Sequence, residues 1–239
     1  MLNLNSKADA VFALTMVFFI IVTEYFFRHY VLFWFPQIGS WRVNDMVSIL
    51  VAYTLLVGVC GTLTAVDWRK ELSGILNAIR DCLTSWKYTP WILAMVLNIG
   101  IFSVLDRLFF ADIKLPIYEA AYLNPIVWLP KLATVLKVIS VIAVNGFFVP
   151  VAEELLWRGI VQPRLGRILP ISVAISFTAI LFSMKHVIID GSFSRFLMAI
   201  GFGIICGILA SRKSWNASAA LHVFINTVSS ITALVMEIK

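Results

Sequence analysis

Charged residues are scarce in this sequence. They make up 13% of its 239 residues, and hydrophobic residues make up 61%; soluble domains typically contain about 25% charged residues. Regular alternation of polar and apolar residues over about ten positions is also missing, which excludes a membrane β-barrel. Composition therefore predicts an all-α protein, a polytopic bundle of transmembrane helices.

Cysteine is rare too. Cys60, Cys82 and Cys206 show neither the spacing of a metal site nor that of a disulfide framework. Acidic residues are fewer than basic ones, and the net charge is +6. Lys and Arg lie mostly in short segments between apolar runs, where they anchor helices and set orientation. We therefore predict no nucleic-acid partner. The charge distribution favours, by a narrow margin, an N-terminus in the cytoplasm.

About seven apolar runs are long enough to span a bilayer, which takes about 20 residues. The polar segment 67–89 carries apolar residues at helical spacing, so it predicts an amphipathic helix lying on the membrane. We expect one membrane domain, 1–239, with N-terminal helices in 1–130 and a catalytic four-helix core in 131–236. An extramembrane connection is expected at 112–130. The predicted spans are 8–28, 46–66, 91–110, 132–157, 168–189, 193–210 and 215–236.

Several ionisable and amide side chains interrupt the later spans. A carboxylate in hydrocarbon costs several kcal/mol, so such residues are tolerated mainly where they have a function. In the fourth span, Pro150 with Asn145 and Gly146 before it predicts a loosened helical turn just ahead of two glutamates. The residues that stand out are Glu153, Glu154, Arg158, His186, His222 and Asn226.

The spacing of these residues predicts that they converge. If the fourth and fifth spans form a hairpin that turns at 169–170, Glu153 and His186 lie at the same depth. His222 and Asn226 are four residues apart and share one helix face. Their predicted depth in the membrane matches that of His186 only loosely. Glu154 and Arg158 have the spacing of an ion pair, which leaves Glu153 as the freer carboxylate.

This set of groups can hydrolyse a peptide. Glu153, helped by His186, would remove a proton from water as general base. His222 and the Asn226 amide would face the oxyanion that then develops on the peptide carbonyl. The alternative is a zinc site made by Glu153, His186 and His222, since two histidines and a glutamate are a known catalytic ligand set. The helical His-Glu-x-x-His pattern of such sites is absent.

Other polar residues in the spans have simpler interpretations. Glu24 and Arg28 have the spacing of a local ion pair, and Asp45 is interpreted as a cap or interface charge at the start of the second span. Lys185 is counted among the charges near a membrane surface. We leave these residues out of the site. Gly203 and Gly207 predict close helix packing within the bundle.

The three polar groups together resemble a known family. Glu153-Glu154-x-x-x-Arg158, Phe182-x-x-x-His186 and His222-x-x-x-Asn226 are similar to the motifs of the CAAX prenyl protease and bacteriocin-processing family of intramembrane proteases. The resemblance covers about 145–230. It implies Glu153 as catalytic glutamate, His186 as its partner, His222 and Asn226 as oxyanion stabilisers, and Glu154 and Arg158 as supporting residues.

The resemblance also implies a substrate class and a mechanism without a metal cofactor. Family members cleave peptides near a membrane-attached end, which can be prenylated or a helical C-terminus. We expect an integral protein of a bacterial inner membrane, and its oligomeric state is left open. Two alternatives remain: a proton-coupled transporter with a Glu–His relay, and a non-catalytic immunity or scaffold protein of the same family.

Overall fold

The computed structural model describes residues 4–30, 41–105, 108, 135, 137–190 and 193–238. Within these residues seven helical stretches are long and apolar enough to cross a membrane, and no strand occurs. The predicted all-α bundle of about seven spans is thus confirmed. The end of the third predicted span and the connection 112–130 lie outside the described residues. The stretches are Lys7–His29, Asp45–Leu63, Trp86–Leu105, Lys137–Gly166, Ile171–Ile189, Arg195–Arg212 and Trp215–Val235.

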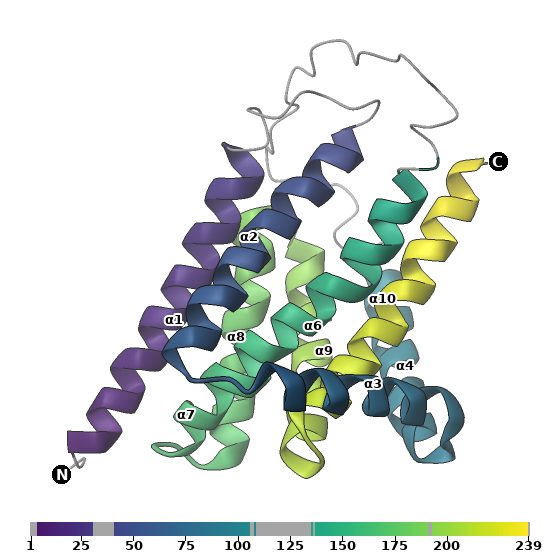
Figure 1. The fold of residues 1–239 in the computed structure, drawn as a ribbon. Coiled ribbons are helices and arrows are strands. Elements are labelled where there is room, and N and C mark those ends of the chain that lie inside the picture. The colour runs from purple at the N-terminus through teal and green to yellow at the C-terminus, as the bar shows by residue number, and fades with distance from the viewer. Residues whose placement is uncertain are drawn as a thin grey trace.

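The spans stand side by side as one bundle (Figure 1). The first and last helices, α1 (Leu4–His29) and α10 (Trp215–Ile238), both run from the same end of the bundle to the other. Between them stand α2 (Trp41–Leu63), α8 (Ile171–Asp190) and α9 (Phe193–Arg212). At the outer edge, α4 (Thr89–Leu105) is joined to α9 by a hydrogen bond from Asn98 Nδ2 to the Met198 carbonyl, 3.0 Å long.

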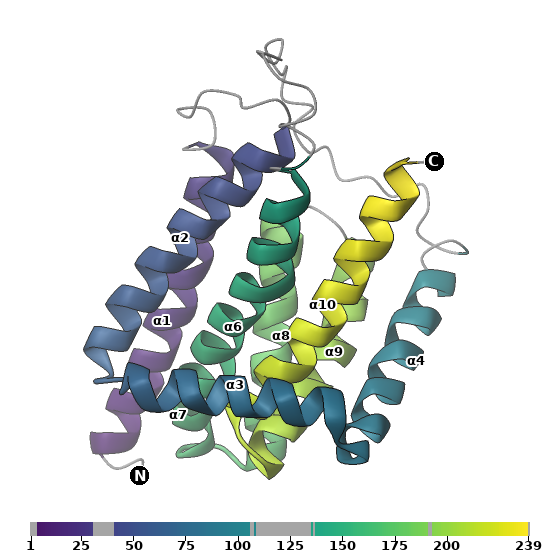
Figure 2. The same ribbon diagram turned by 45° about the vertical axis from the view of Figure 1, so that its right-hand side comes forward.

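One helix lies across the end of the bundle where α1 begins. This helix, α3 (Trp68–Thr84), runs roughly perpendicular to the spans (Figure 2). The Asp67 side chain caps it by accepting hydrogen bonds from two backbone amides of its first turn. A hydrogen bond of 3.2 Å from Asn216 Nδ2 to Glu71 Oε2 joins it to α10. Because Leu72, Leu76 and Leu83 remain exposed, α3 presents the uncovered apolar face that the segment 67–89 predicted.

The fourth span is irregular around its two glutamates. Its backbone widens into π-helical turns on both sides of a short α-helix that starts next to Pro150. This confirms the predicted loosened turn, and π-helical turns occur frequently at functional sites. The pieces are η4 (Val141–Phe148), α6 (Val149–Glu154), η5 (Leu155–Val161) and α7 (Gln162–Gly166). Since α8 begins at Ile171, the hairpin turns where the sequence predicts.

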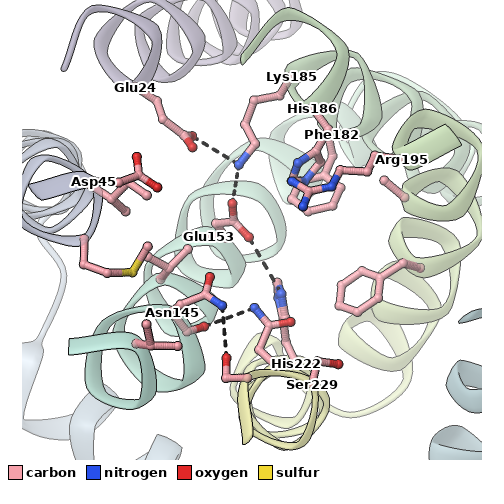
Figure 3. A pocket seen from close by; sticks show the side chains of 18 of the residues that line it. Glu24, Asp45, Asn145, Glu153, Phe182, Lys185, His186, Arg195, His222 and Ser229 are labelled. Atoms are coloured by element: carbon pink, nitrogen blue, oxygen red, sulfur yellow. Dashed lines mark hydrogen bonds and ion pairs between the residues drawn. The ribbon is translucent and has the colours of Figure 1, made fainter. Parts of the chain in front are cut away.

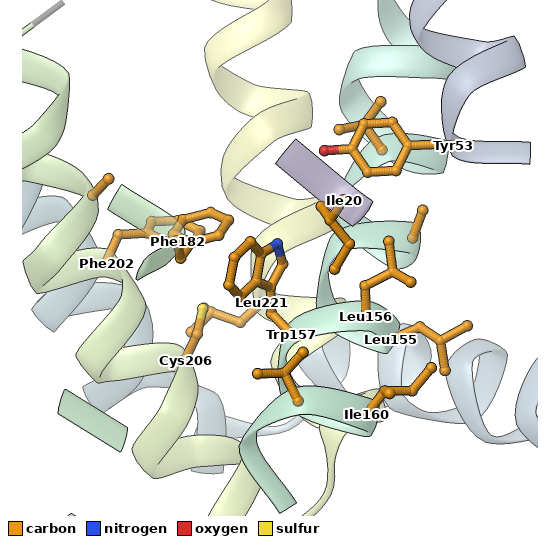
Figure 4. Packing of buried hydrophobic residues seen from close by; sticks show 14 of the residues in the cluster. Ile20, Tyr53, Leu155, Leu156, Trp157, Ile160, Phe182, Phe202, Cys206 and Leu221 are labelled. Atoms are coloured by element: carbon orange, nitrogen blue, oxygen red, sulfur yellow. The ribbon is translucent and has the colours of Figure 1, made fainter. Parts of the chain in front are cut away.

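Large side chains fill the middle of the bundle (Figure 4). Trp157 is fully buried, and its ring meets Phe182 edge-on with the centroids 5.7 Å apart. Phe182 in turn stacks on Phe202 of α9 at 6.3 Å. Interiors packed this closely transmit small displacements instead of absorbing them. The core therefore holds α8 and α9 in one position against the glutamate-bearing span.

Two glycines set the approach of α9 to α8. A Cβ atom added at Gly203 would lie 2.9 Å from the Ala179 Cβ, and one added at Gly207 would lie 2.8 Å from Ile175 Cγ2. Real Cβ atoms essentially never come so close. The prediction that these glycines pack within the bundle is confirmed.

Candidate active site

A cavity of about 490 Å³ lies between the spans, and all four residues predicted to be catalytic line it. Glu153 comes from α6, His186 from α8, and His222 and Asn226 from α10 (Figure 3). The wall also includes the last turns of α1 and the beginnings of α2 and α9. These ends lie away from α3 (Figure 1), so the cavity occupies the half of the bundle opposite that helix.

Glu154 and Arg158 form the predicted ion pair, which is confirmed. Arg158 Nη1 donates to Glu154 Oε1 over 3.0 Å, and neither side chain is exposed. The Arg158 guanidinium also donates to the Gly203 carbonyl at 3.3 Å and lies 4.6 Å from the centre of the Phe182 ring. A buried pair is tolerated only when further partners satisfy both groups. Both oxygens of Glu154 have such partners, and so does Arg158 Nη2, whereas Arg158 Nε has no hydrogen-bond partner among the described residues.

Glu154 holds the imidazole of His222. Its Oε1 lies 3.0 Å from His222 Nδ1, and its Oε2 accepts a hydrogen bond of 2.6 Å from the Ser218 hydroxyl. Because an ionised carboxylate can only accept, Nδ1 of His222 carries a hydrogen. The other ring nitrogen, Nε2, then faces Glu153, whose Oε2 is 3.8 Å away. Glu154 thus orients His222 and does not line the cavity itself.

Glu153 is far from being a freer carboxylate, and that part of the prediction is wrong. Its Oε1 accepts a hydrogen bond of 2.8 Å from the Tyr53 hydroxyl and is in direct contact with Lys185 Nζ. Only Oε2 is left to face His222 (Figure 3). The reason is tertiary: α2 and α8 each bring a donor that no local pattern connects to Glu153.

His186 reaches the same cavity as Glu153, as the hairpin geometry predicts. Its ring meets Phe182 edge-on at a centroid distance of 5.0 Å. Phe182 therefore supports the imidazole by packing against its ring. The residue before His186 is the one that contacts Glu153, so α8 brings both a histidine and a lysine to the site.

Asn226 and its neighbours tie α10 to η4. Asn226 Nδ2 donates to the Asn145 carbonyl over 3.2 Å, and the Asn145 amide donates to the Ser230 hydroxyl over 3.1 Å. Thr227 makes a similar bond of 3.1 Å to the Gly146 carbonyl. The widened turn of η4 thus presents the carbonyls to which α10 binds. One N–H of the Asn226 amide remains for the cavity.

A second set of polar residues lines the cavity next to Glu153 and was not predicted from the sequence. Lys185 is not a surface charge, because it is 1% exposed and its Nζ lies 3.1 Å from Glu24 Oε2. Arg28 pairs with Glu24 at 3.8 Å and with Asp45 at 3.2 Å, so their pairing is not purely local. Asp45 lies inside α2 and is no cap. A signal was present, since an ionisable residue within a span indicates function by default.

The zinc alternative has no assembled ligand set. In the described ranges, no group of three or more His, Cys, Asp or Glu side chains is arranged to hold a metal ion. Glu153, His186 and His222 share the cavity, but an ammonium group, that of Lys185, stands against the Glu153 carboxylate. The arrangement does not fit zinc, and the absence of a cofactor remains a prediction.

Fold and cavity together define an integral membrane protein with an ionisable site inside its helical bundle. Residues 135–228 match the family model described as Rce1-like, type II CAAX prenyl endopeptidase. This stretch carries all six residues of the predicted site and is similar to the domain of that family. The match supports a CAAX-type intramembrane endopeptidase in general. No curated protein and no solved structure matches the chain.

Proposed function

We propose that the protein is an intramembrane endopeptidase that hydrolyses a peptide bond near a membrane-attached end of its substrate. One observation carries the proposal: Glu153, His186, His222 and Asn226, from three separate spans, line a single cavity of about 490 Å³. Sites for small ligands typically have volumes of about 300–1,000 Å³. The cavity is therefore large enough for an extended segment of peptide and a water molecule.

The reaction is a general-base hydrolysis. Glu153 takes a proton from a water molecule positioned with His186, and the oxygen attacks the peptide carbonyl. The carbonyl oxygen becomes negative and accepts hydrogen bonds from His222 Nε2–H and the second Asn226 N–H. The C–N bond then breaks as Glu153 returns the proton to the leaving amine. The products are a carboxylic acid and an amine, which become a carboxylate and an ammonium group when the acid's proton passes to the amine.

The surroundings of His222 support this assignment. Glu154 accepts the Nδ1 hydrogen at 3.0 Å, and Ser218 holds the far oxygen of Glu154 at 2.6 Å. A residue that binds one ring nitrogen of an imidazole also fixes the direction in which the second ring nitrogen points. In His222 the bound nitrogen is Nδ1, and the nitrogen that is directed by this contact is Nε2. An imidazolium held between Glu154 and Glu153 would offer Nε2–H to a developing oxyanion at little cost in reorganisation.

The substrate class follows from the family and the location of the site. The match indicates a membrane-associated peptide, and we propose that its attached end is prenylated or a helical C-terminus. Many basic residues gather at the α3 end of the bundle, among them Arg69, Arg167 and Lys213. By the positive-inside rule we place this end in the cytoplasm of a bacterial cell and the cavity in the outer half.

The test uses purified protein in detergent with two probes, a farnesylated peptide and a peptide with a helical C-terminal tail. Wild type should cleave at least one of them, and Glu153→Ala and His186→Ala should each lower kcat about 100-fold or more. Glu71→Gln, a carboxylate change on α3, is the matched control. Cleavage that survives both cavity substitutions would rule out this mechanism.

The same assay separates the alternatives. A chelator should leave the rate unchanged, because the proposed mechanism uses no metal, whereas loss of cleavage reversed by zinc would favour a metal site. Proteoliposomes that move protons without cleaving either probe would favour the transporter. Tight binding of a peptide that stays intact would favour the immunity or scaffold protein.

A further inference from the structure

Three buried side chains outside the resembled motifs form a cluster at one oxygen of Glu153: two of them contact this oxygen, and the third contacts those two. They are Glu24 of α1, Tyr53 of α2 and Lys185 of α8, and each is at most 4% exposed. Lys185 Nζ contacts Glu153 Oε1 and lies 3.1 Å from Glu24 Oε2. Two carboxylates therefore share one ammonium (Figure 3), and only one of the two belongs to the proposed catalytic residues.

We propose that Glu24 is the permanent counter-ion of Lys185, and that Glu24, Tyr53 and Lys185 are positioning residues that let Glu153 change its charge during catalysis. The inference rests on the proposed function, because it is in the proposed hydrolysis that Glu153 gains and loses a proton. It goes beyond that function because Glu24 and Tyr53 lie outside the matched range 135–228. The N-terminal spans thus complete the site.

Charge balance requires such a residue. A buried ammonium must have a carboxylate partner, because an uncompensated charge in a low-dielectric interior is strongly destabilising. When Glu153 holds the proton taken from water it is neutral and no longer balances Lys185. Glu24 is already 3.1 Å from Nζ, so the ammonium keeps one carboxylate without having to move.

The formal charges around Glu24 fit this role. Arg28 pairs with Glu24 at 3.8 Å and with Asp45 at 3.2 Å. Arg28 and Lys185 therefore carry two positive charges against the two negative charges of Glu24 and Asp45. The four charges cancel without Glu153. The negative charge of an ionised Glu153 is then additional, and it faces His222: Glu153 Oε2 lies 3.8 Å from His222 Nε2.

Tyr53 can follow the change of charge. Its hydroxyl oxygen lies 2.6 Å from Glu24 Oε2 and 2.8 Å from Glu153 Oε1, but it has only one hydrogen to donate. The oxygen accepts from Lys185 Nζ at 2.9 Å. A rotation of the hydroxyl sends the hydrogen to Glu153 when that group is ionised and to Glu24 when it is neutral.

The first test needs no substrate, because Glu153→Gln imitates the protonated glutamate. Thermal unfolding in detergent should change little in Glu153→Gln, since Glu24 still balances Lys185. The double variant, Glu153→Gln with Glu24→Gln, lacks both carboxylates that the structure describes at Lys185. Its midpoint of thermal unfolding should fall by about 10 °C more than the sum of the falls in the two single variants. Adding Lys185→Met to that pair should restore most of the loss.

The outcomes are decisive in both directions. A double variant whose loss equals the sum of the single losses, or a triple variant without recovery, would overturn the inference. Asp9→Asn is the control on the same helix, because Asp9 pairs with exposed Arg167 at 3.1 Å and does not line the cavity. It should show no coupling to Glu153→Gln.

The second test uses the cleavage assay and separates the two proposals. Glu24→Gln should lower kcat about 100-fold with KM little changed, and Glu24→Gln with Lys185→Met should recover about tenfold of that loss. Recovery of kcat when Lys185→Met is added to Glu24→Gln distinguishes charge balance from a merely structural role. A fully active Glu24→Gln beside an inactive Glu153→Gln would overturn the inference alone. Full activity in Glu153→Gln would overturn the proposed function and leave the unfolding series to judge the charge pairing.

Discussion

Glu153 and Glu154 are neighbours in the sequence and belong to two different buried clusters. The inner cluster consists of Glu154, Arg158, Ser218 and His222, all within 135–228. The crossing cluster consists of Glu24, Tyr53, Glu153 and Lys185 and joins spans inside and outside that range. Consecutive helical residues point about 100° apart, which is why adjacent carboxylates reach separate partners.

The two clusters differ in how many carboxylates contact their arginine or lysine. In the inner cluster Arg158 pairs with one carboxylate, 3.0 Å away, and the ion pair has no reason to change. In the crossing cluster Lys185 contacts two carboxylates, so one of them can become neutral while the ammonium stays balanced. The comparison suggests that the first cluster orients His222 and that the second provides the group that exchanges a proton.

The largest effect is expected from breaking the inner cluster. Arg158→Met leaves the Glu154 carboxylate buried without its guanidinium, which should cost about 3–5 kcal/mol of folding stability. Thermal or denaturant unfolding in detergent measures the loss. Glu154→Gln combined with Arg158→Met should recover part of it. An Arg158→Met protein as stable as wild type would show that the inner cluster is not a fixed scaffold.

A smaller loss of stability is expected from Gly203→Ala. The added methyl group would lie 2.9 Å from the Ala179 Cβ and 3.3 Å from Arg158 Nη2, so it presses on the helix crossing that holds the inner cluster. Overpacking of this kind typically costs about 1–3 kcal/mol. Gly58→Ala, on α2 with nothing within 4 Å of the new atom, is the control and should be neutral or stabilising. Equal stability of both variants would contradict the tight crossing.

The crossing cluster should respond in activity more than in stability. Tyr53→Phe removes one hydroxyl and leaves the packing of a fully buried ring intact. A hydrogen bond to a charged group is worth about 1.5–3 kcal/mol, and because Lys185 still binds Glu153 we expect only about a tenfold fall in kcat. Steady-state kinetics with the cleaved probe measures it. A higher KM at constant kcat would instead place Tyr53 in substrate binding.

The last prediction concerns a residue outside both clusters, Cys82 of α3, and involves no change in activity. Burial raises the pKa of this thiol to about 11, although nearby Lys213 opposes the shift. Since the thiolate is the reactive form, maleimide should modify Cys82 at pH 8 on the order of 100-fold more slowly than a free cysteine. The assay uses protein in which Cys60 and Cys206 are serine. Rapid labelling would show that this thiol is not buried.

Local pattern predicted much of the site. Four-residue spacing identified the Glu154–Arg158 pair, which the structure confirms at 3.0 Å, and the hairpin symmetry brought His186 into the cavity with Glu153. It failed for Lys185, which adjoins His186 and was interpreted as a surface charge although it is 1% exposed. Its partner Glu24 is 161 positions away in the sequence, so no spacing rule connects them.

Composition and helical spacing alone determined that this protein is a helical membrane bundle of about seven spans with Glu153 and His186 at one depth, because the length of a span and the rise of a helix are local properties. Which oxygen of Glu153 is engaged, and by which helix, was decided only by the tertiary structure. The partners of this oxygen come from α2 and α8, and α1 contributes the carboxylate that binds those partners. The energy of burying a charge depends on such neighbours, which only folding of the chain brings together.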